Sequence, residues 1–536
     1  MVAPPLMQAA AASQASGADL ARAPSLWQDR ASLYMLAFGA LLHLALASAI
    51  HLSPDEAHYA LYAAHLDWSY YDHPPLVGWL QWPWLQLGGS DLLLRLMPML
   101  AWCVAALGLR ALTLDCLPAT AGQRLSPHHA ALGLWLLSPL PHLLGVAWVP
   151  DTALLMLVPA MMALVWRLVR REGGARLGLW AALGLCMGLS GLAKYTTVVL
   201  GLGALLVLHW GRGLGLWRQP GFWLALLLAV AVVTPVFWWN ATHDWISLRY
   251  QVDHAAGSEA PRQAWRVLWF ALVQVLVYGL LPVFGCWWAC RSPRAVGLDA
   301  RVLCLGFGLP VLLLLAWLSA RRLPLPHWAA PAWLALLPLA GAGVARMYEV
   351  GRRRVLGLAA WQALGVVAMV LALLWGGGPA ESGEAAQTLP HEGGRGVGNP
   401  VADLYGWDEA SARAKALAAE RRVARLAVHN WTLASRVAWY ARPLPVQVLD
   451  GRPGQFGLWF GEMPAGADAL VLDWSLMSRP MPVGPEGFER CDLLESRPVV
   501  HLGRQLSHFS FLHCRGWRSV PAAPAAAPGS APGTLP

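Results

Sequence analysis

The sequence predicts a polytopic α-helical membrane protein of about eleven transmembrane helices with a small C-terminal α/β domain. Hydrophobic residues make up 57% of the 536 residues and charged residues only 13%, whereas a soluble domain carries roughly 25% charged residues. The 31 tryptophans outnumber the 11 tyrosines and 11 phenylalanines, which is typical of many helix ends at membrane interfaces. We therefore expect much of the chain to face lipid.

Each predicted span follows from an apolar run, since a transmembrane helix needs roughly 20 mostly apolar residues. Arginine clusters fall on alternate connections between these runs, as they do in cytoplasmic loops, which places the N-terminus inside and the end of the last run outside. Arg321 and Arg322 are exceptions on the outward side. The runs are 31–50, 92–112, 130–149, 152–169, 177–193, 195–211, 220–239, 265–289, 302–320, 328–346 and 355–375.

Composition predicts the other domains. Beyond 400, short β-like runs (Arg425–His429, Val446–Leu449, Ala469–Asp473) alternate with helical ones (Asp408–Glu420, Leu433–Tyr440), as in an α/β domain. Runs near 488–502 and 505–514 predict a hairpin with Cys491 and Cys514 at its open ends, which can pair in an oxidising compartment. The predicted domains are a disordered tail (1–30), a transmembrane domain (31–375), a linker (376–400), the α/β domain (401–517) and a disordered tail (518–536).

The net charge of +9 does not indicate nucleic acid binding, because the arginines lie in short clusters between apolar runs. The other six cysteines lie in or beside apolar segments without the spacing of metal ligands, so we expect them to be small core residues.

The first outward loop begins with Ser53-Pro54-Asp55-Glu56, which has the pattern of a capping box with proline at the first helical position. The cap occupies Glu56, and Asp55 points away from it. We therefore predict Asp55 as the reactive carboxylate and Glu56 as its support.

Asp72 and His73 follow in the same loop, directly before two prolines. The aromatic residues ahead of them are typical of anchors at the headgroup level. An acid and an imidazole close to the membrane, where unpaired charge is costly, indicate a functional pair.

Further charged residues are predicted at the same membrane level. Asp151 opens a span, where the helix dipole alone also favours an acid. Lys194, the one lysine of the membrane part, lies in an outward turn, where it either serves the site or snorkels. Arg249 and Arg321 are further outward cations.

A metal site is a weaker hypothesis. His51, His58 and His65 recur every seven residues, but the cap at Ser53 leaves His51 outside the helix, and such histidines are more often interfacial. No convincing nucleotide-binding motif is present. An activated donor would then have to arrive on another carrier, and a lipid suits a membrane enzyme.

Several motifs together resemble bacterial members of the dolichyl-phosphate-mannose–protein mannosyltransferase family, which are family 39-like glycosyltransferases of the GT-C fold related to the enzymes that add aminoarabinose to lipid A. The resemblance covers roughly residues 31–345 and continues weakly into the α/β domain. Its motifs are Asp55-Glu56, Trp68-Ser-Tyr-Tyr-Asp-His-Pro-Pro-Leu, Pro150-Asp151-Thr, Ala193-Lys194-Tyr195-Thr196, Pro235-Val-Phe-Trp-Trp-Asn240, His327-Trp328-Ala-Ala-Pro331, Asp403-Leu-Tyr-Gly-Trp-Asp408 and Asp450-Gly-Arg with Gln455-Phe-Gly-Leu-Trp459.

The resemblance implies an inverting glycosyltransferase that moves a sugar from a polyprenyl-phosphate carrier to an acceptor hydroxyl on a glycolipid, lipid A, a polymer or a protein. It implies a multi-pass protein of the bacterial inner membrane with a cytoplasmic N-terminus and a periplasmic α/β domain. No cofactor and no metal are expected, and nucleic acid is not a partner. The implied site comprises catalytic Asp55, Asp72 and Asp151, supporting Glu56 and His73, donor-phosphate-binding Lys194, Arg249 and Arg321, and substrate-binding Tyr59, Tyr195 and His327.

One position departs from the pattern. The aminoarabinose enzymes carry Glu-Lys before the two prolines, and their lysine contacts the donor phosphate, whereas this chain has Asp72-His73. A neutral histidine contributes less to phosphate binding than a lysine does.

Two other classes of function compete with a transferase. A transporter or lipid flippase would carry its ionisable residues at mid-depth in broken helices, often in repeated halves, whereas here they fall in loops on one side. A binding module on a membrane anchor would not need about eleven spans.

Overall fold

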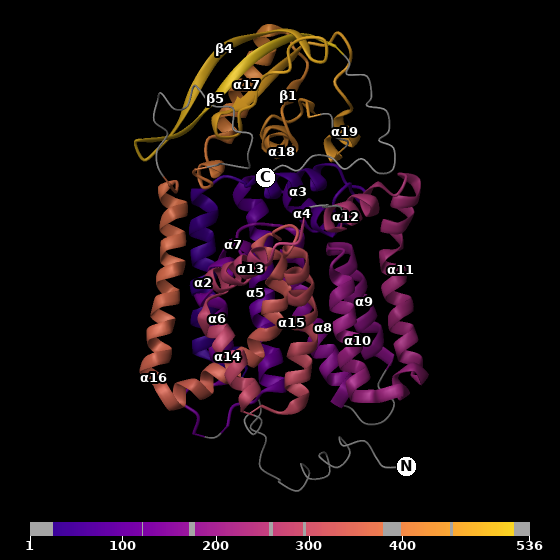
Figure 1. Cartoon of the computed structure of the whole chain (residues 1–536), viewed down its shortest axis with the longest axis vertical. Helices are drawn as coiled ribbons and strands as arrows, with labels where there is room; N and C mark the ends of the chain where they lie inside the picture. Colours follow the sequence, from indigo (N-terminus) through magenta and orange to yellow (C-terminus); the bar gives the residue numbers. More distant parts are fainter. Residues whose placement is uncertain are drawn as a thin grey trace.

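The computed structural model describes residues 25–120, 122–170, 177–256, 261–292, 296–378, 398–450 and 454–518. Its helices form a membrane part, and a sheet with its own helices covers one end of it (Figure 1). The helices of the membrane part are α2 (Arg30–Ala49), α3 (Pro54–Ala64), α4 (Leu76–Gln86), α5 (Asp91–Cys116), α6 (Pro127–Leu137), α7 (Pro139–Leu144), α8 (Pro150–Arg170), α9 (Leu177–Ala193), α10 (Thr197–Arg212), α11 (Pro220–Thr242), α12 (Ile246–Ala256), α13 (Ala264–Tyr278), α14 (Leu280–Arg291), α15 (Leu298–Ser319) and α16 (Ala330–Trp375).

The chain crosses the membrane several times. Within the described residues, seven helices are long and apolar enough to span a bilayer, and an eighth span results if the bent pair α13 and α14 is counted as one. Large apolar side chains on their outer faces stay exposed, for example Leu227 on α11, Leu276 on α13 and Leu364 on α16. Lipid is the solvent that such faces require.

Four predicted spans differ from separate straight helices, and each difference has a local cause. Run 130–149 divides into α6 and α7 because Ser138 precedes a proline and is extended. The helices α13 and α14 meet at an angle of 101° across Gly279, whose φ of 90° only glycine adopts readily. The last two runs form the single helix α16, which is interrupted at Gly351.

The outer part is a five-stranded sheet in the order β2-β1-β3-β5-β4. Strands β1, β2 and β3 are parallel, and β5 pairs antiparallel with both β3 and β4. The alternation of strands and helices predicted from the sequence is confirmed. The elements are α17 (Trp407–Arg421), β1 (Leu426–Val428), α18 (Trp431–Tyr440), β2 (Val446–Val448), α19 (Gln455–Phe460), β3 (Ala469–Trp474), β4 (Phe488–His501) and β5 (Arg504–Trp517).

The predicted terminal hairpin is confirmed as β4 and β5. Cys491 lies directly opposite Cys514 in the ladder, and a disulfide bond joins them. Most of the two predicted tails and of the linker lies outside the described residues. Residues 25–30 of the first tail are structured, however, because Asp29 is the buried N-cap of α2 and forms an ion pair with Arg110.

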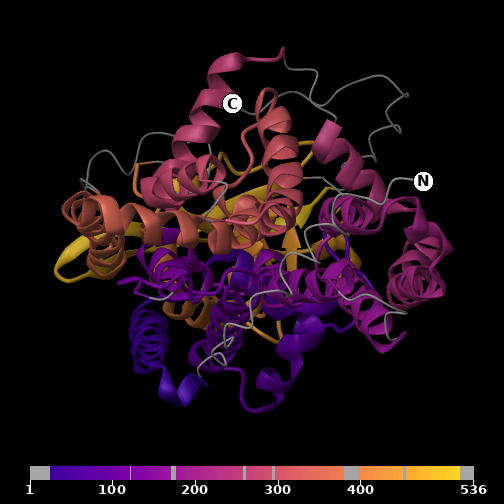
Figure 2. The ribbon, with the colours of Figure 1, turned by 90° about the horizontal axis from the view of Figure 1, so that it is seen from below.

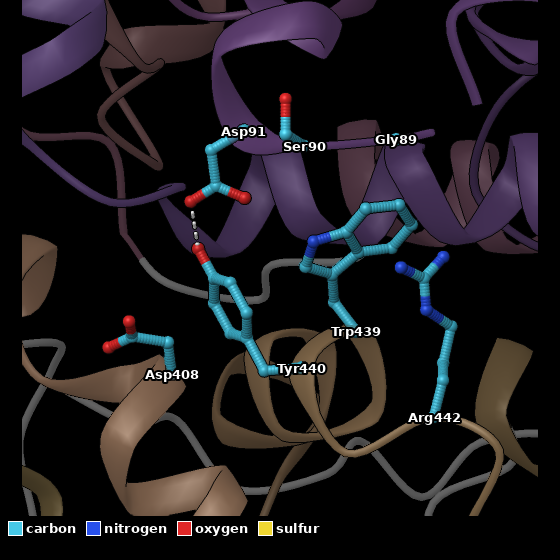
Figure 3. Close-up of a pocket in the computed structure, with 7 residues that line it drawn as sticks. All are labelled: Gly89, Ser90, Asp91, Asp408, Trp439, Tyr440 and Arg442. Atoms are coloured by element: carbon cyan, nitrogen blue, oxygen red, sulfur yellow. Dashed lines mark hydrogen bonds between the residues drawn. The ribbon is translucent and has the colours of Figure 1, made fainter. Parts of the chain in front are cut away.

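The two parts of the molecule are in direct contact. Seen from the end opposite the sheet, the strands lie behind the helices (Figure 2). The His51 amide donates to the Leu404 carbonyl at 3.0 Å. At the start of α5, Asp91 accepts a 2.5 Å hydrogen bond from Tyr440 of α18, beside a cavity of about 390 Å³ that both parts line (Figure 3). The outer part is therefore packed on the membrane part.

Candidate active site

The helix α3 begins as the sequence predicts. Ser53 is the N-cap and Pro54 the first helical residue. The Glu56 amide donates to the Ser53 hydroxyl at 3.3 Å, and the Ser53 amide donates to the Glu56 carboxylate at 3.0 Å. The capping box is confirmed, and Asp55 is left half-buried at the second helical position.

A buried arginine holds the start of this helix in place. It was not predicted from the sequence. Arg95 of α5 pairs with both oxygens of Glu56, at 2.8 and 3.2 Å. Its guanidinium also donates to the main-chain carbonyls of Ala47, Ile50 and His51. Arg95 is only 1% exposed, and an arginine inside an apolar run was the sequence signal for such a buried partner. The end of α2 and the start of α3 are thereby joined to α5.

Asp72 lies in the loop between α3 and α4 and is held at both oxygens. Tyr62 of α3 donates a hydrogen bond to Oδ1, and His58 Nε2 lies 3.3 Å from Oδ2. Burial alone would raise the pKa of Asp72, but the charge of His58 and the bonds from both partners hold that pKa below its usual range. Asp72 is therefore a carboxylate near pH 7.

Neighbouring helices also hold the loop that carries Asp72. Gln455 of α19 accepts a 2.7 Å hydrogen bond from the Tyr71 amide. Gln251 of α12 donates to the Asp72 carbonyl at 2.5 Å. The loop is thus attached to the outer part on one side and to an outward-facing helix of the membrane part on the other.

Asp151 and Lys194 form a buried ion pair, which sequence reasoning brought only to the same side of the membrane. The lysine Nζ lies 2.8 and 2.6 Å from the two carboxylate oxygens, at exposures of 5% for Lys194 and 1% for Asp151. His327 Nε2 lies 3.5 Å from Asp151, and the ammonium lies 5.3 Å from the centre of the Trp328 ring. The turn that carries Lys194, the start of α8 and the segment before α16 therefore meet at this ion pair.

The charges of all three predicted catalytic acids act on Tyr59 of α3. Burial raises the pKa of the Tyr59 hydroxyl well above its ordinary value, and the negative charges of Asp72, Asp55 and Asp151 raise it further. Asp55 lies in the first turn of α3, Asp72 in the loop after α3 and Asp151 in the first turn of α8. Acids from three separate segments therefore influence the same buried hydroxyl.

His73 is also close to this group of acids. Burial lowers the pKa of His73 to about 4; the charge of Asp72 opposes this shift, and that of Lys194 adds to it. Near pH 7 His73 is therefore a neutral imidazole, as the departure from the Glu-Lys pattern indicated.

The other predicted site residues, Tyr195, Arg249 and Arg321, make different contacts. Tyr195 and Ser247 share a 2.7 Å hydrogen bond between their hydroxyls. Arg249 is exposed on α12, and the Arg321 carbonyl accepts a hydrogen bond from Arg266.

Tyr250 and Arg322 were not predicted as site residues. The Tyr250 ring lies 4.8 Å from that of Tyr71, in the loop that carries Asp72. Burial raises the pKa of Tyr250 to about 12, the charge of Asp72 adds to this, and the charge of Arg322 opposes it. The position of Arg322 beside Arg321, where both depart from the arginine rule, was the available sequence signal.

The three histidines spaced by seven do not form a metal site. His51 contacts Asp408, His58 contacts Asp72, and His65 stacks on Trp459. Asp29, His128 and His129 do lie close enough together to hold an ion, at the far end of α2. The Asp29 carboxylate is already engaged by Arg110 and by the Ser32 hydroxyl, so its surroundings disfavour another cation.

Comparison with known proteins agrees with the resemblance seen in the sequence. Residues 72–239 match the family model described as dolichyl-phosphate-mannose-protein mannosyltransferase. The predicted resemblance to this family is confirmed. The matched segment contains Asp72, Asp151 and Lys194, while Asp55 lies ahead of it.

Curated relatives support the same family. The lipid A galacturonosyltransferase RgtD of Rhizobium johnstonii is 28% identical over 289 residues, which are 52% of this chain and 58% of that protein. The undecaprenyl phosphate-alpha-4-amino-4-deoxy-L-arabinose arabinosyl transferase 2 of Pseudomonas fluorescens is 28% identical over 213 residues, 37% of each chain. The chain thus spans less than two thirds of the length of these relatives.

Solved structures establish the fold. Crystal structures of ArnT from Cupriavidus metallidurans, in the apo state and bound to undecaprenyl phosphate, superpose with TM-scores of 0.59 and 0.58 at 17% and 16% identity. Each alignment covers 90% of this chain and 97% of the other. The chain has the GT-C membrane fold, as the resemblance implied.

Proposed function

We propose that this protein is an inverting glycosyltransferase that moves a sugar from a polyprenyl-phosphate donor to an acceptor hydroxyl. The observation that carries the proposal is the buried ion pair that holds the Lys194 ammonium against Asp151. The charges of Asp151, Asp55 and Asp72 also act together on the Tyr59 hydroxyl. Support comes from the printed names of its relatives, a lipid A galacturonosyltransferase and an undecaprenyl phosphate aminoarabinose transferase, and from the ArnT structure with undecaprenyl phosphate. The acceptor class we propose is lipid A or another glycolipid.

The reaction is a single displacement. The acceptor oxygen attacks the anomeric carbon, the bond from that carbon to the phosphate oxygen breaks, and the phosphate leaves with the electron pair. A sugar hydroxyl has a pKa far above 7, so it needs a carboxylate within hydrogen-bond distance to take its proton as the bond forms. Attack from the face opposite the phosphate inverts the configuration.

We assign the proton-accepting role to Asp55. Asp55 lies at the second position of a helix that the capping box and Arg95 fix in place. A fixed carboxylate is what general base catalysis requires.

The leaving phosphate needs positive charge that does not have to reorganise. We propose that Lys194 supplies it, with Asp151 and His327 setting its position. Arg249 and Arg321 are proposed as outer contacts that the donor engages on binding, and the neutral His73 as a hydrogen-bonding group beside Asp72. Glu56 supports α3, and Tyr59 and Tyr195 are proposed to contact the substrate.

We further propose that the protein is a multi-pass protein of the bacterial inner membrane, with a cytoplasmic N-terminus and a periplasmic α/β domain at 401–517. The disulfide between Cys491 and Cys514 fits an oxidising compartment. In the described residues, the acids lie in the first turn of α3, in the loop after it and in the first turn of α8, whereas a transport path would place them in broken helices. Reporter fusions after residue 376 test this: an external signal is expected, and a cytoplasmic signal would overturn the orientation.

The test of the reaction is Asp55→Asn in membranes supplied with polyprenyl-phosphate sugar and glycolipid acceptor. We expect transfer to fall by about 10²- to 10⁴-fold, the usual contribution of a general base. Asp67→Asn is the matched control, because Asp67 lies exposed in the same loop and its contact with Trp239 needs only an acceptor oxygen. Near-full transfer by a folded Asp55→Asn protein would contradict the assignment of Asp55 as the base.

A further inference from the structure

His58 links the loop acid Asp72 to the outer part of the molecule. It lies on α3, one helical turn after Asp55, and is 3% exposed. Its Nε2 is 3.3 Å from the Asp72 Oδ2, and its Nδ1 is 3.4 Å from the Ser435 hydroxyl on α18. The imidazole thus has a site acid on one side and a residue of the outer part on the other.

The hydrogen-bond directions define how this imidazole is oriented. Ser435 donates its single hydroxyl hydrogen to the Trp431 carbonyl at 2.8 Å, so the serine oxygen can only accept from His58 Nδ1. Nε2, on the other side of the ring, faces the Asp72 carboxylate at 3.3 Å, where a donor is the complementary group. His58 therefore lies between Ser435 and Asp72 with one ring nitrogen toward each.

Aromatic side chains enclose the imidazole. Trp431, Phe456 and Trp459 of the outer part and Tyr59 and Tyr62 of α3 all have ring centres between 5.2 and 5.8 Å from it. Such an enclosure leaves the ring little freedom to rotate away from Asp72. It also keeps water away from the contact between the imidazole and Asp72.

A serine, a histidine and an acid also form the catalytic triads of hydrolases, but Ser435 is not positioned to act as a nucleophile. Ser435 is fully buried and donates its proton to its own helix, whereas a nucleophilic serine must face the substrate and give its proton to the base. The contacts here run in the opposite direction to those of a triad. Ser435 accepts from His58, and His58 in turn contacts Asp72.

We propose that His58 is a positioning residue for Asp72, and that the outer part completes the active site by orienting His58 through Ser435. The inference rests on the proposed transfer reaction. It assigns the outer part a role in setting the geometry of a site acid, in place of a separate binding function. Misplacing a group of the site by about 1 Å can cost about 100-fold in rate, so loss of this contact should lower kcat more than it changes KM.

The experiment compares His58→Gln with His58→Asn. The glutamine amide reaches the position of Nε2 and can still donate to Asp72, whereas the shorter asparagine amide reaches only the position of Nδ1. We expect His58→Gln to lower kcat by less than about 10-fold and His58→Asn by about 10- to 100-fold, each with KM for the donor within about threefold of wild type. Equal kcat values for the two variants, or a change confined to KM, would overturn the inference.

A second variant removes the contact from the outer side. Ser435→Ala should lower kcat by about 10-fold, since the imidazole then loses its anchor. Ser411→Ala is the matched control: Ser411 is equally buried in the outer part, on α17, and its hydroxyl has no hydrogen-bond partner among the described residues. Equal activity of the two serine variants would also overturn the inference. Lack of transfer by the wild-type protein would instead contradict the proposed function.

Discussion

Removal of the Lys194 ammonium should destabilise the membrane part strongly. The Lys194→Met substitution keeps the length of the side chain but leaves the Asp151 carboxylate, which is 1% exposed, without its main counter-charge. Breaking a buried ion pair from one side costs about 3–5 kcal/mol, because the remaining charge stays buried. We expect the lower end, about 3 kcal/mol, since the His327 imidazole remains 3.5 Å from the carboxylate and the charge keeps one polar neighbour. At 1.4 kcal/mol for each factor of ten, the ratio of folded to unfolded protein falls about 100-fold.

The assay is unfolding of the purified protein in mixed detergent micelles with increasing sodium dodecyl sulfate, followed by tryptophan fluorescence. Lys415→Met is the matched control, because Lys415, the other lysine of the chain, donates to the Arg442 carbonyl at a partly exposed site. The double variant Lys194→Met/Asp151→Asn should recover most of the stability, because no charge is left buried, yet it should remain inactive. Unchanged stability of Lys194→Met would refute the reasoning from a buried pair.

Two further predictions concern the outer part. Its contact between His51 and Asp408 raises the pKa of His51 and lowers that of Asp408, so the stabilisation is present near pH 6 and is lost as pH rises through the raised His51 value. The melting temperature of His51→Gln should lie below wild type at about pH 6 and equal it at about pH 9; an equal deficit at both would exclude titration of His51 as the cause. Replacing Cys491 and Cys514 by serine opens a loop with a sequence separation of 23 and should cost about 3 kcal/mol in the β4–β5 hairpin. Reductant should lower the wild-type melting temperature in the same way and leave the variant unchanged; an effect of reductant on the variant would contradict this account.

Local patterns predicted much of the fold. The capping box at Ser53 and the hairpin around Cys491 depend on neighbours in sequence, and both are confirmed. The straight spans follow from hydropathy alone. The breaks at Ser138 and Gly279 were missed because an apolar run has the same composition whether or not a proline or a glycine divides it.

The site was predictable in its acids but not in their partners. Asp55, Asp72 and Asp151 stood out because charge near lipid is costly. Arg95, Tyr62 and Ser435 come from distant segments, and the contacts they make depend on how helices pack, which one sequence does not encode in any local pattern. His58 was visible only as part of a histidine spacing, and its actual partner, Asp72, lies fourteen residues further on.

The contact between Arg95 and Glu56 has a consequence for how the protein is made. The two residues are 39 positions apart in the chain, and α5 emerges from the ribosome well after α3. The capped helix that carries Asp55 thus cannot be fixed against the bundle until α5 has been synthesised and inserted. Asp55, the proposed base, therefore reaches its final position only late in membrane assembly. A chain arrested before α5 would contain Asp55 but would lack the contact that fixes its helix.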